Sequence, residues 1–208
     1  MNLIDSLITE FDRGLRTVFA PAAGRREMPG KLITSEPMDP SDKAESGRMM
    51  RVNHTGEICA QALYQGQALV ARSAEIRKVL QAAADEEQDH LAWCERRLDD
   101  LGASTSILNP IWYAGSFGLG VVSGTLGDRW SMAFLVETER QVERHLDSHL
   151  ERLPLADTRS RQVLEAMRED EIRHGDSGEA QGAAPMPAAV KSAMGLVSKI
   201  MTRTAYWV

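Results

Sequence analysis

Two four-residue strings constrain this chain more than any other feature of its sequence. They are Glu87-Gln-Asp-His90 and Glu171-Ile-Arg-His174, the only Glu-x-x-His sequences present. A candidate carboxylate precedes each string by about 30 residues, Glu57 before the first and Glu139 before the second. Residues three apart share one face of an α-helix, so each string can direct a carboxylate and an imidazole at one point. The similar spacing predicts a helix, a short turn and an antiparallel helix, used twice.

Together the four segments match the ligand pattern of a helical bundle that binds two metal ions. In ferritin-like carboxylate proteins, one Glu comes from each of two helices and a Glu-x-x-His motif from each of the other two. We therefore expect an all-α, ferritin-like four-helix bundle with additional amphipathic helices at both ends. The predicted metal ligands, which are also the predicted catalytic residues, are Glu57, Glu87, His90, Glu139, Glu171 and His174.

The third predicted helix contains two candidate ligands, Glu137 and Glu139, whose faces differ by about 200° at the helical repeat. Glu139 shares its face with four apolar residues between Met132 and Leu146, which predicts that it points into the interior. Glu137 shares its face with polar residues between Arg140 and Arg144, which predicts that it points to water. Glu139 is therefore the chosen ligand.

The ligand types indicate the metal. Carboxylates with only two imidazoles favour iron or manganese over zinc, which prefers cysteine and histidine. Two ions need bridging carboxylates, and four Glu side chains supply both bridging and terminal ligands. We predict two iron ions, ferrous for dioxygen activation, although the ligands alone do not separate iron from manganese. Without metal, a buried cluster of unpaired carboxylates would be very costly.

Other polar residues are weaker candidates. Glu86 lacks the three-residue offset to a histidine, so it is expected beside a ligand or at the surface. His145 and His149 share a face with polar residues and are expected at the surface. His54 is expected either beside a ligand or in an ordinary polar contact. Tyr64 lies two turns beyond Glu57 and is expected to pack in the core or to approach a substrate channel.

Helical periodicity extends over most of the chain, and no stretch shows sustained period-two alternation. Within the bundle, assigned to residues 48–180, helices are expected over about 48–72 and 73–101, the second ending at Gly102. A third is expected to end near Leu153, and a fourth to run from Asp157 or Thr158 to about Gly178. Residues 1–47 are expected to form an amphipathic helix over 2–19 and a proline-containing linker, in which no chemistry is visible.

Two further segments have apolar character. Residues 103–127 contain no charged residue, which invites a transmembrane interpretation. Pro110 and five glycines make a continuous span improbable, so we expect packing on the bundle with an apolar surface open to lipid or to a hydrophobic substrate. Residues 181–208 are expected to form a basic amphipathic helix, suited to an anionic membrane surface or docked on the bundle.

Five sequence segments resemble the di-iron hydroxylases of ubiquinone biosynthesis that act on demethoxyubiquinol. They are Arg51-Val-Asn-His-Thr-Gly-Glu57, Asp85-Glu-Glu-Gln-Asp-His90, Phe117-Gly-Leu-Gly120, Thr138-Glu-Arg-Gln-Val-Glu143 and Asp170-Glu-Ile-Arg-His174. The first is specific to this family among ferritin-like proteins. The resemblance covers nearly all of the chain after residue 47, and all six predicted ligands occupy the family's ligand positions.

The resemblance implies a monooxygenase that uses dioxygen to hydroxylate the ring of a 2-polyprenyl-3-methyl-6-methoxy-1,4-benzoquinol. It also implies a peripheral protein on the cytoplasmic side of the cell membrane. The two electrons are expected from a reduced pyridine nucleotide such as NADH, directly or through the quinone, although no Gly-x-Gly-x-x-Gly fingerprint is present. Both a homo-oligomer and a complex with other ubiquinone-biosynthesis proteins remain open.

Charge and cysteine content narrow the functional classes. A net charge of −6 argues against nucleic-acid binding, and two cysteines imply no disulfide framework. Two alternatives to the hydroxylase remain at this point. One is a ferritin-like protein that stores iron or handles peroxide, and the other is a non-enzymatic, membrane-associated helical scaffold.

Overall fold

The computed structural model describes residues 3–33 and 37–208, and in these ranges the chain is helical, with seven helices and no strand. The predicted all-α class is therefore confirmed, while residue 2 of the predicted first helix and residues 34–36 of the predicted linker lie outside the described ranges. The helices are α1 (Leu3–Phe19), α2 (Pro40–Val70), α3 (Ala74–Leu101), α4 (Asn109–Thr125), α5 (Asp128–Arg152), α6 (Thr158–Ala180) and α7 (Ala188–Trp207).

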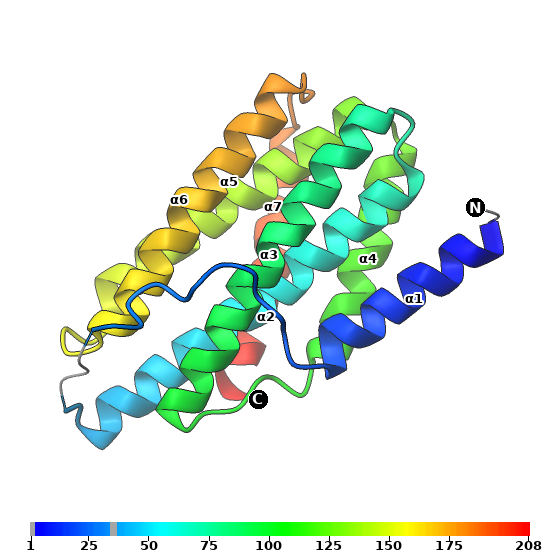
Figure 1. The fold of residues 1–208 in the computed structure, drawn as a ribbon. Helices are drawn as coiled ribbons and strands as arrows, with labels where there is room; N and C mark the ends of the chain where they lie inside the picture. The colour runs from blue at the N-terminus through cyan, green and yellow to red at the C-terminus, as the bar shows by residue number, and fades with distance from the viewer. Residues whose placement is uncertain (1–2, 34–36) are drawn as a thin grey trace.

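The four ligand-bearing helices form two antiparallel pairs, α2 with α3 and α5 with α6 (Figure 1). Two apolar clusters fill the bundle. One is built around Trp93, Leu98 and Met167, and the other around Leu80 and Leu135. The predicted ligands fall between these clusters along α2, α3 and α5, and they follow the first cluster along α6. The core therefore holds a polar layer enclosed by apolar packing.

Helix ends follow the expected local chemistry, with one exception. The hydroxyl of Ser73 accepts hydrogen bonds from the first turn of α3, and Gly102 ends that helix at φ 66°. Asp157 caps α6 by accepting from the amide of Ser160 at 3.0 Å. The exception is α2, which begins at Pro40 rather than near residue 48, because proline at the first helical position sacrifices no hydrogen bond. The predicted linker is therefore too long at its C-terminal end.

Helix α4, formed by the uncharged segment, lies along α2 and owes its close approach to glycines. A Cβ on Gly120 would lie 2.2 Å from the carbonyl oxygen of Leu63, and one on Gly66 would lie 2.4 Å from that of Phe117. Only glycine permits such backbone contact. The glycines thus serve packing between two helices. In the described part of the chain, no helix combines the length and the apolar character needed to cross a membrane.

The terminal helices cover opposite parts of the bundle. Helix α1 lies against α2 and α4, where Thr17 donates a hydrogen bond to Gln61 at 2.6 Å. Helix α7 crosses α2 and α5 and directs Met194 and Met201 into the bundle, as expected for a docked amphipathic helix (Figure 1). The extended arm of residues 20–33 leaves α1 and crosses α3 toward α6. The boundaries at residues 47 and 180 stay predictions.

Candidate metal centre

The six predicted ligands meet in the centre of the bundle as two overlapping groups. One group is Glu57, Glu87, His90 and Glu171, and the other is Glu87, Glu139, Glu171 and His174. Within each group, one donor atom per residue lies within 4.8 Å of all the others, and every member is buried. Glu87 and Glu171 belong to both groups. The arrangement could hold two adjacent ions, each beside one histidine and one unshared Glu, with two carboxylates common to both groups.

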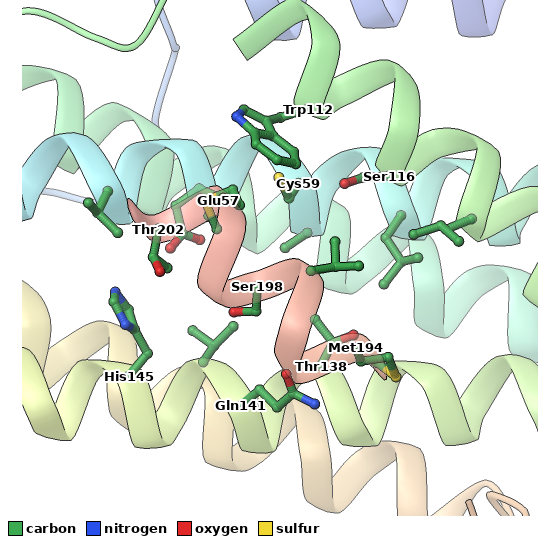
Figure 2. Close-up of a pocket in the computed structure, with 18 of the residues that line it drawn as sticks. Glu57, Cys59, Trp112, Ser116, Thr138, Gln141, His145, Met194, Ser198 and Thr202 are labelled. Atoms are coloured by element: carbon green, nitrogen blue, oxygen red, sulfur yellow. The ribbon is translucent and has the colours of Figure 1, made fainter. Parts of the chain in front are cut away.

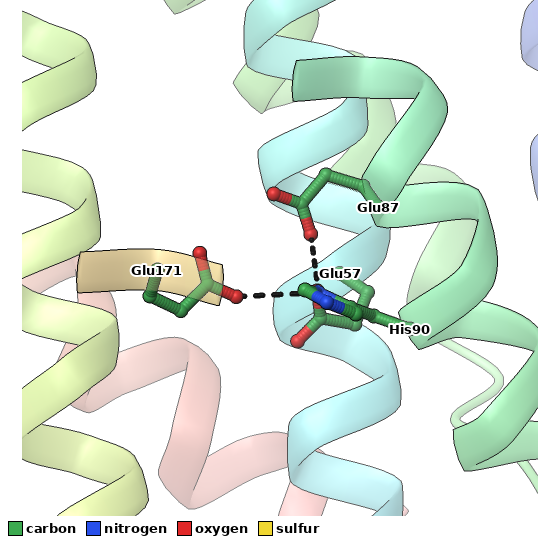
Figure 3. Close-up of side chains that lie close together, drawn as sticks. All are labelled: Glu57, Glu87, His90 and Glu171. Atoms are coloured by element: carbon green, nitrogen blue, oxygen red, sulfur yellow. Dashed lines mark hydrogen bonds and ion pairs between the residues drawn. The ribbon is translucent and has the colours of Figure 1, made fainter. Parts of the chain in front are cut away.

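His90 defines the first site. Its Nδ1 atom lies 3.1 Å from Glu87, 3.3 Å from Glu171 and 3.5 Å from Glu57 (Figure 3). Three carboxylates from three helices therefore converge on one ring nitrogen of His90. A cation bound there would contact the three carboxylates that now contact the imidazole directly.

His174 defines the second site in the same way. Its Nδ1 atom lies 3.4 Å from Glu87, 3.4 Å from Glu139 and 3.5 Å from Glu171. Because the two histidines come from α3 and α6, and the unshared carboxylates from α2 and α5, all four bundle helices are needed. The face argument that selected Glu139 is consistent with this position.

Several polar atoms in the centre are buried without a hydrogen-bond partner. They include one oxygen of Glu87, one of Glu139, both of Glu171 and both nitrogens of His174, whose contacts with carboxylates are ion-pair distances without hydrogen-bond geometry. Burying such groups unpaired is costly, and native proteins rarely do it without a reason. Metal ions would satisfy these atoms, so the residues fit the two ions that the ligand types indicate.

Burial and mutual contacts shift the pKa values of the four predicted glutamate ligands in different directions. Burial raises the pKa of Glu57 and Glu139 well above the ordinary value, and the charges of neighbouring carboxylates raise it further. Burial also acts to raise the pKa of Glu87 and Glu171, but contacts with the two histidines outweigh it, so both pKa values are lowered. A bound cation would act against this rise, because a positive charge favours the ionised carboxylates.

A second layer of carboxylates holds the two histidines from behind. His90 Nε2 lies 2.9 Å from Asp170, and His174 Nε2 lies 3.3 Å from Glu86. Each pair crosses between α3 and α6, because the acidic residue that precedes a ligand Glu contacts the histidine of the other helix. Such contacts fix which ring nitrogen faces a metal. Glu86 was expected beside a ligand or at the surface, and it is both, with a side chain 39% exposed.

Asp170 was not singled out as a site residue, although the sequence contained a signal for it. An acidic residue precedes the ligand Glu in both strings, as Glu86-Glu87 and Asp170-Glu171. That repetition alone does not identify the histidine that each residue contacts. The crossed pairing depends on the distance between α3 and α6.

Tyr64 also contacts a predicted ligand. Its side chain is fully buried among apolar residues, as expected for core packing, and its hydroxyl donates a hydrogen bond to Glu139. Burial raises the pKa of Tyr64 well above the ordinary value, and the charge of Glu139 contributes. Tyr64 is therefore a neutral hydrogen-bond donor to the second site.

Glu137 does not point to water as expected. It is 4% exposed and lies 3.2 Å from Lys191 of α7, while Gln141 donates to it at 2.8 Å. The expectation was wrong because α7 covers this face of α5, which the periodicity of α5 alone does not reveal. Glu137 remains outside both ligand groups.

The surface position expected for His145 and His149 is also wrong. His149 is 3% exposed, and the two rings lie 4.0 Å apart beneath the C-terminal part of α7. Burial lowers the pKa of His145 to about 4 and that of His149 to about 2, with the nearby Arg152 adding to both shifts. His54 is in an ordinary polar contact, 3.4 Å from Asn109 and 3.5 Å from Glu95.

An apolar cavity of about 360 Å³ lies beside the centre and is lined by residues of α2, α4, α5 and α7. Among the six ligands, Glu57 lines it (Figure 2). Trp112, Phe134, Leu119 and Met194 supply much of the apolar wall. A hydrophobic molecule in this cavity would lie next to the first ion site.

The geometry agrees with comparisons to known proteins. The family model described as ubiquinone biosynthesis protein COQ7 matches residues 44–205. A protein of Nitrosomonas eutropha is 53% identical over 205 residues, and one of Nitrosomonas europaea is 54% identical over 205 residues, with 99% of each chain covered. A protein of Dechloromonas aromatica is 52% identical over 202 residues, covering 97% of this chain and 98% of its own. All three are named 3-demethoxyubiquinol 3-hydroxylase. The chain therefore belongs to the COQ7 family of ubiquinone biosynthesis proteins.

Proposed function

We propose that this protein is a 3-demethoxyubiquinol 3-hydroxylase that works with two iron ions. The family and the full-length relatives establish a hydroxylase of ubiquinone biosynthesis, so the storage and scaffold alternatives fall away. One structural observation supports the di-iron form, namely two ligand groups that share Glu87 and Glu171 beside an apolar cavity.

The residues divide into terminal and shared ligands. Glu57 and His90 would hold one ion, Glu139 and His174 the other, and Glu87 and Glu171 would contact both. Two ferrous ions bound here would supply the electrons and the open positions needed to activate dioxygen. The reaction consumes one dioxygen, two electrons and two protons, and one oxygen atom enters the ring while the other leaves as water.

The protein's own part is to orient the quinol and to exclude water. The cavity brings a ring against Glu57, and its apolar lining suits the ring and the start of a polyprenyl chain. Helix α7 covers one side, so water reaches the centre less readily. Tyr64, Asp170 and Glu86 hold three of the ligands in place by the contacts described above. A reduced pyridine nucleotide such as NADH supplies the electrons in this proposal.

The exterior suggests how a lipid-soluble quinol reaches the cavity. Large apolar side chains are exposed on α1, α4 and α7, including Phe11, Ile111 and Ile200, which are 70%, 67% and 50% exposed. Lys199 and Arg203 lie on α7 as well. In this proposal the protein is peripheral on the cytoplasmic side of the cell membrane.

Vesicle binding tests this location. Deleting residues 188–208 would also uncover the cavity, so outward-facing substitutions are better. A Leu196→Glu/Ile200→Glu variant should lose most of its flotation with anionic vesicles while keeping its iron. Unchanged flotation would contradict a role for α7 at the membrane.

Iron content and product formation together test the main proposal. Anaerobically reconstituted wild type should hold about two irons per chain, and Glu139→Ala should lose iron. Glu137→Ala is the matched control, because this neighbouring carboxylate contacts Lys191 instead of the centre, and it should keep both irons. Hydroxylation of demethoxyubiquinol should follow the iron content. Bound iron without quinol hydroxylation would contradict the proposed role of the two ions, and wild type without bound metal would refute the di-iron proposal.

A further inference from the structure

We propose that Arg26, on the extended arm of residues 20–33, is a positioning residue for the metal ligand His90. The inference rests on the proposed metal centre and adds a residue far from it in sequence. The family match begins at residue 44, so the arm precedes the segment that carries the ligands. The arm was interpreted from sequence as a linker with no visible chemistry.

The arm is anchored on the outer face of α3 and α6. The backbone amide of Ala22 donates to Glu95 at 2.8 Å, and the amides of Arg25 and Arg26 both donate to Asp89. Met28 is 5% exposed and joins the apolar cluster around Trp93. These contacts hold the arm in one place on the bundle. Figure 1 shows the same path, with the blue chain crossing in front of α3.

From this position the Arg26 guanidinium reaches two buried carboxylates at once. Its Nε atom donates to Asp89 Oδ2 at 2.8 Å, and its Nη2 atom lies 2.7 Å from Asp170 Oδ2. Both carboxylates are nearly buried, with side chains 5% and 6% exposed. The rigid fork of an arginine suits this double contact, because its donors keep fixed directions.

The contact with Asp170 is made at the oxygen that serves the ligand. His90 Nε2 lies 2.9 Å from the same Oδ2 atom, while Arg173 contacts the other oxygen, Oδ1, at 2.5 Å. Arg26 therefore fixes the direction in which Asp170 presents its acceptor to His90. Orientation of His90 decides where Nδ1 points, and Nδ1 is the atom that faces the ligand carboxylates.

A second path links the same two residues through Trp93. The guanidinium lies 4.7 Å from the centre of the Trp93 ring, and that ring lies 5.4 Å from the ring of His90. The indole nitrogen of Trp93 donates to the carbonyl of Arg26 at 3.4 Å. Arg26 therefore contacts both Asp170 and Trp93, the two residues that lie beside His90 outside the ligand group.

Metal affinity of the metal-free protein measures this role without enzyme activity. Co²⁺ is titrated against a coloured chelator, and its absorption spectrum reports the ligand geometry. Arg26→Ala should weaken one of the two sites by about tenfold, toward the lower end of what loss of a ligand's hydrogen-bond partner costs. Arg25→Ala is the matched control, because that side chain pairs with the exposed Asp85. It should leave both affinities unchanged.

A double-mutant cycle shows whether Arg26 acts through Asp170. If it does, Arg26→Ala should cost much less in an Asp170→Asn background than in wild type. Equal losses in both backgrounds, or equal affinities for the Arg26→Ala and Arg25→Ala proteins, would overturn the proposal. Equal weakening of both sites with a lowered melting temperature would also overturn it in favour of general destabilisation. Wild type that binds fewer than two Co²⁺ would instead refute the metal centre itself.

Discussion

The two ion sites use the same kinds of ligand but are supported very differently. At the first site, His90 is fully buried and rests on Asp170, which is 6% exposed and is held by two arginines. At the second site, His174 rests on Glu86, which is 39% exposed and pairs with one exposed arginine. The apolar cavity lies on the side of the first site. The comparison teaches that two nearly repeated motifs do not make two equal sites. Asp170 is also held by Arg26, which lies outside the repeat, and no residue of the arm forms an ion pair with Glu86 in the described part of the chain.

The largest effect should come from removing a shared ligand. Glu171→Ala removes a carboxylate that belongs to both groups, so it should abolish binding of both ions and all hydroxylation. Glu57→Ala removes an unshared ligand of the first site and should leave about one ion per chain, as expected for paired sites of this ligand pattern. Iron per chain, measured after removal of free metal, separates the two results. Equal losses in the two variants would mean that the sites are not distinct.

Substitutions of Asp170 and Glu86, the carboxylates behind the two histidines, should weaken metal binding to different extents. Asp170→Asn removes a buried charge that holds His90, and it should weaken the first site by about 10- to 100-fold. Glu86→Gln removes a half-exposed charge beside His174, where water can replace the lost contact, and its effect should be several times smaller. Stepwise Co²⁺ titration of both variants measures the difference. If Glu86→Gln costs as much as Asp170→Asn, burial does not explain the contrast.

His145 and His149 lie outside the metal centre, and their effect on stability should depend on pH differently from that of the predicted ligands His90 and His174. Burial holds the pKa of His149 at about 2, so the folded protein keeps this ring neutral while the unfolded chain protonates it below about 6.5. The unfolded state therefore binds an extra proton as pH falls between these values. The resulting stability is fully present above the unfolded pKa and is lost as the pH drops.

Replacing His149 tests this account. Between pH 7 and pH 5, wild type should lose about 2 kcal/mol more unfolding free energy than His149→Gln. Denaturant unfolding of both proteins at equal metal loading measures it. Identical pH dependence would show that folding does not lower the pKa of His149. The ligands His90 and His174 differ, because contacts with carboxylates outweigh burial and raise their pKa values.

The smallest effect should come from Tyr64 at the second site. Tyr64→Phe removes the hydrogen bond to Glu139 while keeping the buried ring, and it should cost about 1 kcal/mol of ion binding there. The first site should keep its affinity, since Glu139, which accepts from Tyr64, belongs to the second ligand group and not to the first. Stepwise Co²⁺ titration again reports each site. A loss confined to the first site would contradict the assignment.

Much of the site was predictable because spacing along a single helix determines which side chains share a face. Residues three apart share a face, so each Glu-x-x-His string had to present its two side chains together. The apolar neighbours of Glu139 correctly distinguished it from Glu137 as the residue that joins a ligand group. The predictions that Glu137, His145 and His149 lie at the surface were wrong for one shared reason. Helix α7 covers their face of α5, and periodicity within one helix does not report which other helix will pack on it.

By itself, the sequence determined the all-helical class, the main helix ends, the family resemblance and the six predicted ligands that meet in the centre of the bundle. These features depend on local capping and on spacing along single helices, which are short-range properties. Tertiary structure alone decided that Glu87 and Glu171 are shared, that Asp170 and Glu86 cross between α3 and α6, and that Arg26 reaches Asp170 from 144 positions away. Those relations depend on the distances between packed elements, and no periodicity within one segment encodes them.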